Sequence, residues 1–176
     1  MPTEILVEEL LFTFPDGVRA EDLDRGGKRG QADGIKLVDL VIEDDGRLLL
    51  VEVKDPSHTG ALDTERERFM QAMQARELLP QLAAKARGSY MFVHLMEQDT
   101  HPMAYVVVLG LEACPHDPAL LMAFRDRLAH RIRHEGEEPW KREYLTGCAV
   151  LTTESWTEFL PAYGLQRVPN DTTAGG

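Results

Sequence analysis

The chain has 176 residues, of which 43% are hydrophobic and 28% charged, so it can fold as one domain without a disulfide or a structural metal. Its formal net charge of -11 opposes polyanion binding, so a nucleic-acid partner would require its basic residues to cluster on one face. Cys114 and Cys148 fit no metal-ligand spacing and indicate reduced thiols.

We expect no membrane partner. The N-terminal residues are acidic, unlike those of a signal peptide, and the longest apolar runs are far too short to cross a bilayer. The sequence therefore predicts a cytoplasmic protein, with a single domain over residues 1–168 and a polar, disordered tail over residues 169–176.

The first residues carry two competing patterns. Leu10, Phe12 and Phe14 alternate like a strand, which would end at the turn formed by residues 15–17. The residues before it suit a helical turn, with Glu8 and Glu9 on a solvated face. Residues 25–30 follow and mix cations with glycines; they fit a loop that contacts phosphates or a plain surface loop, and we favour the latter.

Residues 36–54 carry the best hairpin signal of the chain. Two apolar stretches, 36–44 and 47–54, flank the turn dipeptide Asp45-Gly46. With a two-residue loop, Asp39 lies directly opposite Glu52, with Cβ atoms about 5 Å apart. A four-residue loop would make them diagonal neighbours. Both registers place them on one face together with Lys54, because side chains alternate with a period of two.

The charges of Asp39, Glu52 and Lys54 are expected in buried surroundings, where a charged group is energetically costly. The flanking residues are apolar on both faces, which is typical of a strand covered on both sides. Two carboxylates there repel each other, and each loses hydration worth several kcal/mol. Lys54 offsets part of this cost. A divalent cation would offset more, and magnesium is the ion usually held by one or two carboxylates with retained waters.

Asp39, the turn, and then Glu52-Val53-Lys54 resemble the active-site signature of the PD-(D/E)XK nuclease superfamily, with Val38 in place of the proline before the aspartate. The resemblance implies a restriction-endonuclease-like α/β domain, with a mixed central sheet of about five strands flanked by helices. It implies Asp39, Glu52 and Lys54 as catalytic residues. It also implies Mg2+ or Mn2+ held by Asp39, Glu52 and the backbone carbonyl of Val53.

Further polar members of the site are also suggested by this resemblance. Some relatives place an acidic residue on a first helix, which makes Glu8 and Glu9 candidates here. Others add a polar residue from a later helix, and Gln71 and Gln74 would fill that place. A solvated helix surface is the commoner explanation of all four.

The rest of the chain predicts helices alternating with strands. The expected elements are a helix opened by Thr64-x-x-Glu67 and kinked or restarted at Pro80, strands over 90–96 and 104–111, a helix from Asp117-Pro118 to near Gly136, a strand over 148–152, and a helix opened by Ser155-x-x-Glu158 and closed near Gly164. The outer face of the helix after Asp117 is basic and fits either a phosphate-contacting surface or a salt-bridged one. It carries Arg125, Arg127, His130, Arg131, Arg133 and His134.

Three hypotheses about function follow. The first is a magnesium-dependent endonuclease for DNA repair, restriction or defence, which binds nucleic acid, with DNA preferred, only weakly in isolation because of its net charge. The second is a nuclease-fold module without activity that binds a protein partner or forms a homodimer. In the third, Asp39, Glu52 and Lys54 form an ordinary cross-strand ion cluster.

Overall fold

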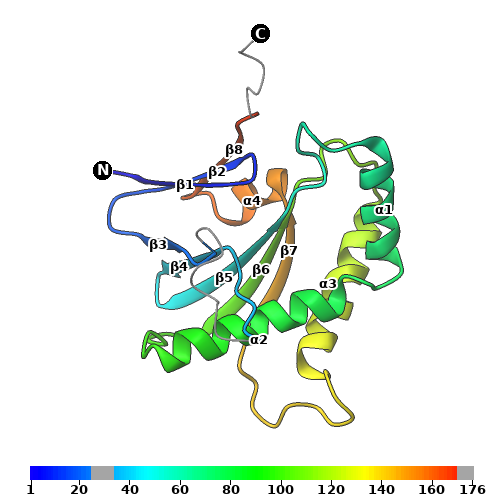
Figure 1. Ribbon diagram of the computed structural model, residues 1–176. Coiled ribbons are helices and arrows are strands. Elements are labelled where there is room, and N and C mark those ends of the chain that lie inside the picture. The colour runs from blue at the N-terminus through cyan, green and yellow to red at the C-terminus, as the bar shows by residue number, and fades with distance from the viewer. Residues whose placement is uncertain (25–33, 170–176) are drawn as a thin grey trace.

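Two β-sheets pack against each other in this protein, and three helices cover the free face of the larger sheet (Figure 1). The structure is a computed structural model that describes residues 1–24 and 34–169. The loop expected at residues 25–30 lies outside the described residues, as does the expected tail beyond residue 169.

The larger sheet has five strands in the order β3-β4-β5-β6-β7. The first three strands are antiparallel, whereas β5, β6 and β7 are parallel, so the expectation of a mixed sheet flanked by helices is confirmed. The strands span Arg19–Asp22 (β3), Leu40–Asp44 (β4), Arg47–Lys54 (β5), Met103–Leu109 (β6) and Gly147–Thr152 (β7).

The remaining elements form a layer on each side of this sheet (Figure 1). On one side lie the helices α1 (Asp63–Gln74), α2 (Leu79–Leu95) and α3 (Pro118–Arg133). On the other side lie an antiparallel sheet of order β1-β2-β8 and the short helix α4. These elements span Thr3–Val7 (β1), Leu10–Phe14 (β2), Thr153–Phe159 (α4) and Gly164–Arg167 (β8). No helix in the described part of the chain is long and apolar enough to span a membrane.

Strand β5 contributes to both hydrophobic cores because its side chains alternate between the two faces. Leu48 and Leu50 point into the core beneath the helices, whereas Leu49, Val51 and Val53 point toward the small sheet. Every residue from 48 to 53 is buried, as expected for a strand covered on both faces. By this alternation Glu52 is directed to the helical side.

The β4–β5 hairpin matches its prediction in loop and register. Asp44 pairs with Arg47, and the turn residues Asp45 and Gly46 have φ of 34° and 82°, as a two-residue hairpin turn requires. Strand β4 is shorter than predicted and begins at Leu40. The reason is that the preceding residues contact α2 instead, where the Val38 N–H donates to the Ser89 hydroxyl over 2.8 Å.

Several expected elements are wrong. The N-terminus forms the β1–β2 hairpin and has no helical turn. Residues 90–96, expected as a strand, continue α2, because a short apolar run does not distinguish a buried strand from a helix. Strand β8 was missed. Helix α1 begins at Asp63 and α4 at Thr153, so neither expected capping box opens its helix.

Other helix signals are confirmed. Pro80 lies in the first turn of α2, which restarts the helical chain after α1. Asp117 caps α3 by accepting a hydrogen bond of 2.9 Å from the Ala119 N–H. In α4 the cap is Thr152, three residues before the expected one, and its hydroxyl accepts from the Ser155 N–H.

Gly88 provides a test of how closely α2 approaches the chain that leads into β4. An ideal Cβ at this position would lie 2.1 Å from the backbone oxygen of Lys36. Although Gly→Ala inside a helix ordinarily stabilises by up to about 1 kcal/mol, we expect Gly88→Ala to lower the free energy of unfolding by about 2 kcal/mol. Urea unfolding measures this change. Gly136→Ala, where a Cβ meets open space, should be neutral, and an equally neutral Gly88→Ala would contradict the close approach.

Candidate active site at the end of the β4–β5 hairpin

Asp39 and Glu52 lie together where β4 begins. The ladder pairs Leu40 with Val51, and its continuation by one residue sets Asp39 opposite Glu52, as predicted. Asp39 Oδ2 accepts a hydrogen bond of 2.7 Å from the Val53 N–H, which fixes the aspartate against β5. Glu52 is completely buried, at 0% exposure. The carboxylates are close enough for the charge of Glu52 to raise the pKa of Asp39.

Two lysines surround the buried glutamate. The ammonium of Lys54 lies 3.0 Å from Glu52 Oε1, as the shared face predicted. Lys85, from α2, lies 2.8 Å from the same oxygen and donates to Oε2 over 2.9 Å. Lys85 was not predicted as a member of the site. The signal for it was a lysine placed between Ala83 and Ala86, two buried alanines that mark the inner face of this helix.

The protonation of two of these groups is perturbed. Burial, and then the charge of Glu52, raise the pKa of Asp39 to about 7. Burial acts to lower the pKa of Lys85, but the Glu52 carboxylate outweighs it, so the net shift is upward. Lys85 is therefore a permanent cation at neutral pH and cannot serve as a general base.

The carboxylate oxygens of Asp39 and Glu52 are donors of the kind that a hard divalent cation prefers. Glu52 Oε1 is buried and receives no hydrogen bond of good geometry, although two ammonium groups lie within 3.0 Å of it. The described residues contain no cluster of three or more His, Cys, Asp or Glu side chains suited to a metal. A metal here would have the two carboxylates as its only side-chain ligands, which is the arrangement magnesium accepts. The ligand role of the Val53 carbonyl stays a prediction.

The other predicted candidates lie elsewhere. Gln71 and Gln74 are exposed on α1, and within the described part of the chain neither contacts the carboxylates. Glu8, with φ of 54°, and Glu9 form the turn between β1 and β2. The expectation that both are solvated is wrong for Glu9, which is 3% exposed and accepts a hydrogen bond from the Thr59 N–H.

Glu9 belongs to a separate cluster centred on Arg167 in β8. The guanidinium of Arg167 donates two hydrogen bonds, of 2.7 and 2.8 Å, to the carboxylate of Asp55, which directly follows β5. It also contacts Glu112 at 2.9 Å and Glu9 at 3.3 Å. This cluster ties the small sheet to the loops that follow β5 and β6.

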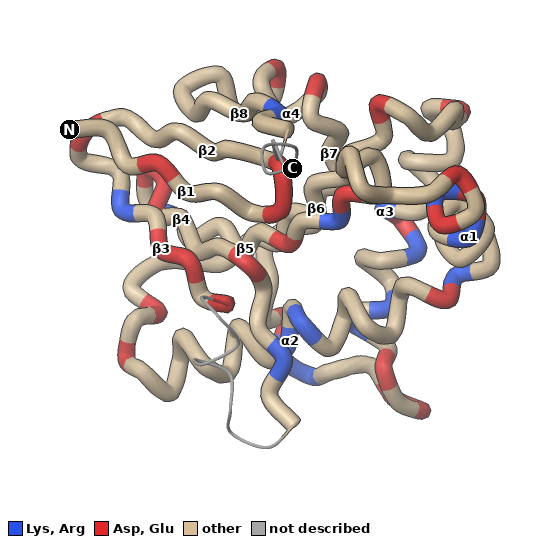
Figure 2. Tube along the Cα trace, turned by 45° about the horizontal axis from the view of Figure 1, so that its top comes forward, with Lys and Arg blue, Asp and Glu red and all other residues tan. Residues whose placement is uncertain are grey.

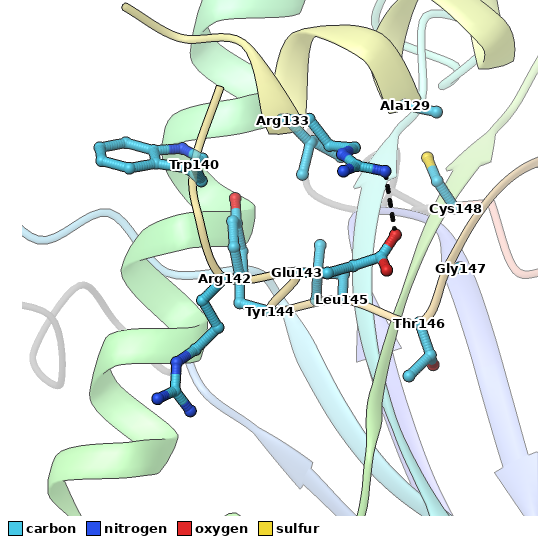
Figure 3. Close-up of a pocket in the computed structure, with 11 residues that line it drawn as sticks. Ala129, Arg133, Trp140, Arg142, Glu143, Tyr144, Leu145, Thr146, Gly147 and Cys148 are labelled. Carbon is cyan, nitrogen blue, oxygen red and sulfur yellow. Dashed lines mark hydrogen bonds and ion pairs between the residues drawn. The ribbon is translucent and has the colours of Figure 1, made fainter. Parts of the chain in front are cut away.

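A cavity of about 110 Å³ lies away from the carboxylates, between the C-terminal part of α3 and residues 140–148 (Figure 3). Arg133 and Glu143 line it and form an ion pair, and the rings of Trp140 and Tyr144 line it apart from this pair. Burial raises the pKa of the Cys148 thiol to about 12, so this lining residue is not a nucleophile at neutral pH. Both cysteines are free, as predicted.

Comparison with protein-family models, with curated proteins and with solved structures finds no match to this chain. The interpretation of the site therefore rests on its own chemistry. That chemistry is a pair of carboxylates on adjacent strands with two lysines at hydrogen-bonding distance from one of them.

Asp39 should make stability depend on pH. Its pKa of about 7 in the folded protein exceeds the ordinary value of 3.8, so folding strengthens proton binding. The resulting stabilisation is fully present below about pH 4 and is lost as the pH rises through about 7. Asp39→Asn, which keeps an oxygen for the Val53 N–H, should gain about 2–4 kcal/mol relative to the parent across this range in urea unfolding. Asp45→Asn, at the exposed turn, should show no such trend, and a pH-independent effect of Asp39→Asn would be inconsistent with a perturbed carboxyl.

The ion pairs of Glu52 with Lys54 and Lys85 determine how replacing this glutamate changes stability. From repulsion between the carboxylates alone, Glu52→Gln should leave the metal-free protein as stable as the parent. Because the side chains of Lys54 and Lys85 are only 25% and 16% exposed and would lose their counter-ion, we instead expect a loss of about 2–3 kcal/mol. Chemical unfolding without metal measures it. Glu4→Gln, at an exposed position of β1, should change stability by less than about 0.5 kcal/mol, and an equally small loss for Glu52→Gln would show that the ion pairs add little.

Proposed function

We propose that this protein is a metal-dependent nuclease with a restriction-endonuclease-like fold and that it hydrolyses phosphodiester bonds at the Asp39–Glu52 pair. The observation that carries the proposal is the placement of Asp39, Glu52 and Lys54 on one sheet face, with Glu52 fully buried. A buried carboxylate beside a second carboxylate is costly and fits a site at which charge has a function.

The topology supports the same proposal. An antiparallel hairpin carries the acidic residues, and its second strand continues into a parallel strand through helices on one face. This arrangement agrees with the restriction-endonuclease-like domain that the signature residues imply. The resemblance rests on three residues and the element pattern, and we propose the family on that basis.

Asp39 and Glu52 would hold the metal ion, and the Val53 carbonyl is the predicted third ligand. A bound magnesium ion would supply a water of lowered pKa and stabilise negative charge on the phosphoryl oxygens. The two carboxylates and two lysines balance one another, so the loaded site would be net positive and suited to an anionic phosphodiester. At neutral pH, Asp39 would release a proton as it becomes a ligand, because its pKa is raised.

The two lysines would have different tasks. Lys54 is the more exposed of the two, and its ammonium would orient the attacking water or offset charge on the phosphate. Lys85 contacts both oxygens of Glu52 and holds that carboxylate in place from α2. Lys85 is thus a positioning residue, whereas Lys54 would act on the reacting groups.

A second candidate function has an observation of its own. The ion cluster of Glu52 with Lys54 and Lys85 neutralises the buried charge without any metal, as a structural cluster would. A nuclease-fold module without activity, which binds a protein partner through its acidic surface or forms a homodimer, would retain such a cluster. Cleavage assays distinguish this module from the enzyme.

Lys54→Ala should abolish cleavage more than binding. The lysine acts mainly on charge that develops in the transition state, so the cleavage rate of a mixed-sequence DNA substrate with Mg2+ or Mn2+ should fall about 100-fold or more. The affinity for the same substrate should change less than about threefold, since one of several phosphate contacts is lost at most. Gel assays of cleavage and anisotropy measurements of binding provide both numbers.

The matched control is Lys36→Ala, which removes an exposed lysine from the chain that leads into the same hairpin and should preserve cleavage. EDTA should stop cleavage by the parent protein. Failure of the parent to cleave any single- or double-stranded substrate with either metal would rule out the autonomous nuclease and favour the binding module.

A further inference from the structure

The basic residues of α2 and α3 form the positive side of an acidic protein. These helices contain Lys85, Arg87, Arg125, Arg127, Arg131 and Arg133, with Asp126 as their only carboxylate. In residues 1–55, by contrast, acidic residues outnumber basic ones. Figure 2 shows Lys and Arg positions along α2 and acidic positions prominent in the strands β1 to β5, whereas α1 carries both signs. Arg87, Arg125 and Arg133 are paired with carboxylates, so the positive charge left for an anionic ligand lies mainly on the unpaired cations of these helices.

The arginines of α3 fall into two classes. Arg125 pairs with Asp126 at 2.8 Å and Arg133 with Glu143 at 3.3 Å, and both arginines are exposed. Arg127 and Arg131 are half-buried, and neither has an ion pair with any other residue in the described ranges. The Nε atom of Arg131 is buried and has no hydrogen-bond partner among the described residues.

The two unpaired arginines line one groove. It lies between the first turn of α2 and the C-terminal half of α3 and has a volume of about 490 Å³. Arg127 and Arg131 are four residues apart and therefore share a face of α3. Arg76, just before α2, lines the groove as well, as do His130 and His134, whose rings stack with centroids 4.2 Å apart.

The Nε of Arg131 is buried without an acceptor among the described residues, and a phosphate oxygen is the acceptor that the planar fork of a guanidinium matches best. The first turn of α2 adds the positive end of the helix dipole. Leu79 and Pro80 of this turn line the groove. Asp126, the carboxylate paired with Arg125, also lines the groove, but the three arginines there leave it with a positive balance that suits a phosphate group.

We propose that this groove binds a backbone phosphate of a nucleic-acid strand. The proposal rests on the proposed function, because the bound strand would be the nuclease substrate. Helix α2 connects the groove with the carboxylate pair. Leu79 lines the groove and Lys85 contacts Glu52, and the helical rise separates the two positions by about 9 Å along α2. The groove would anchor a strand whose neighbouring part reaches the carboxylates.

The proposal is tested by binding without cleavage. A fluorescent single-stranded DNA 20-mer is titrated with the full chain in EDTA, and anisotropy is followed from about 50 to 200 mM salt. Arg127→Ala/Arg131→Ala should weaken binding about tenfold or more and reduce the slope of log K against log salt by about 1.4, since each lost phosphate contact on a single strand contributes about 0.7. Arg127→Ala alone should show about half of this slope change.

The matched control is Arg125→Ala/Arg133→Ala, which removes the same charge from arginines that are already paired and should weaken binding less than about threefold. Equal weakening by both double variants would mean that only bulk charge matters and would overturn the groove, as would no binding by the parent. Displacement of the DNA by micromolar inorganic pyrophosphate would indicate a site for free phosphates and would also overturn it. Thermal melts verify that each variant is folded.

The groove and the nuclease can fail separately. Arginine-specific DNA binding without cleavage under any metal condition would retain the groove and reject the proposed activity. If the Arg127→Ala/Arg131→Ala variant cleaves DNA with metal and binds it with unchanged affinity, the nuclease activity is supported and the groove proposal is wrong.

Discussion

The buried carboxylate of Glu52 is the constraint on which the rest of the structure depends. A charge in the middle of a covered sheet is tolerated only when it is paired, and half of its pairing comes from Lys85 on another element. The helix α2 must therefore lie over β5 with this lysine directed inward. The same helix receives the chain that leads into β4, through Gly88 and Ser89, and so the residue before Leu40 is held opposite Glu52.

Acidic and basic residues are distributed unevenly between the parts of this protein. The acidic excess lies mainly in residues 1–55, whereas α2 and α3 contain Asp126 as their only carboxylate. The net charge of -11 therefore determines the electrostatic potential far from the protein, but not the potential at the surface next to the helices. At physiological ionic strength the Debye length is about 8 Å, so a ligand on the helical side would be governed by the nearby arginines.

The hairpin and its three site residues could be predicted because the signals are local. Asp45-Gly46 determines the loop, and a period of two then places Asp39, Glu52 and Lys54 on one face without knowledge of the remaining fold. Lys85 could not be predicted, since its contact depends on how a helix crosses the sheet. The β1–β2 turn was missed because it contains Glu8 and Glu9, which lack the usual glycine or asparagine signal.

Errors elsewhere have similar physical causes. Residues 90–96 are apolar without a clear period, and only the preceding helix decides their conformation. Strand β8 has four residues and is stabilised by pairing with β2, far away in the sequence. The unpaired state of Arg127 and Arg131 follows from tertiary packing, whereas the sequence shows only a basic helix face.

The long-range contacts of β8 have a consequence for how the protein is made. Arg167 contacts Asp55 and Glu9 across 112 and 158 residues of chain, and Phe12 packs on Trp156 with ring centroids 5.2 Å apart. At ribosomal rates of roughly 5–20 residues per second, the first strands would wait on the order of ten seconds for these partners. During that interval the apolar side chains that Trp156 and β8 later cover would stay exposed, which makes an incomplete chain more prone to aggregation than the finished one.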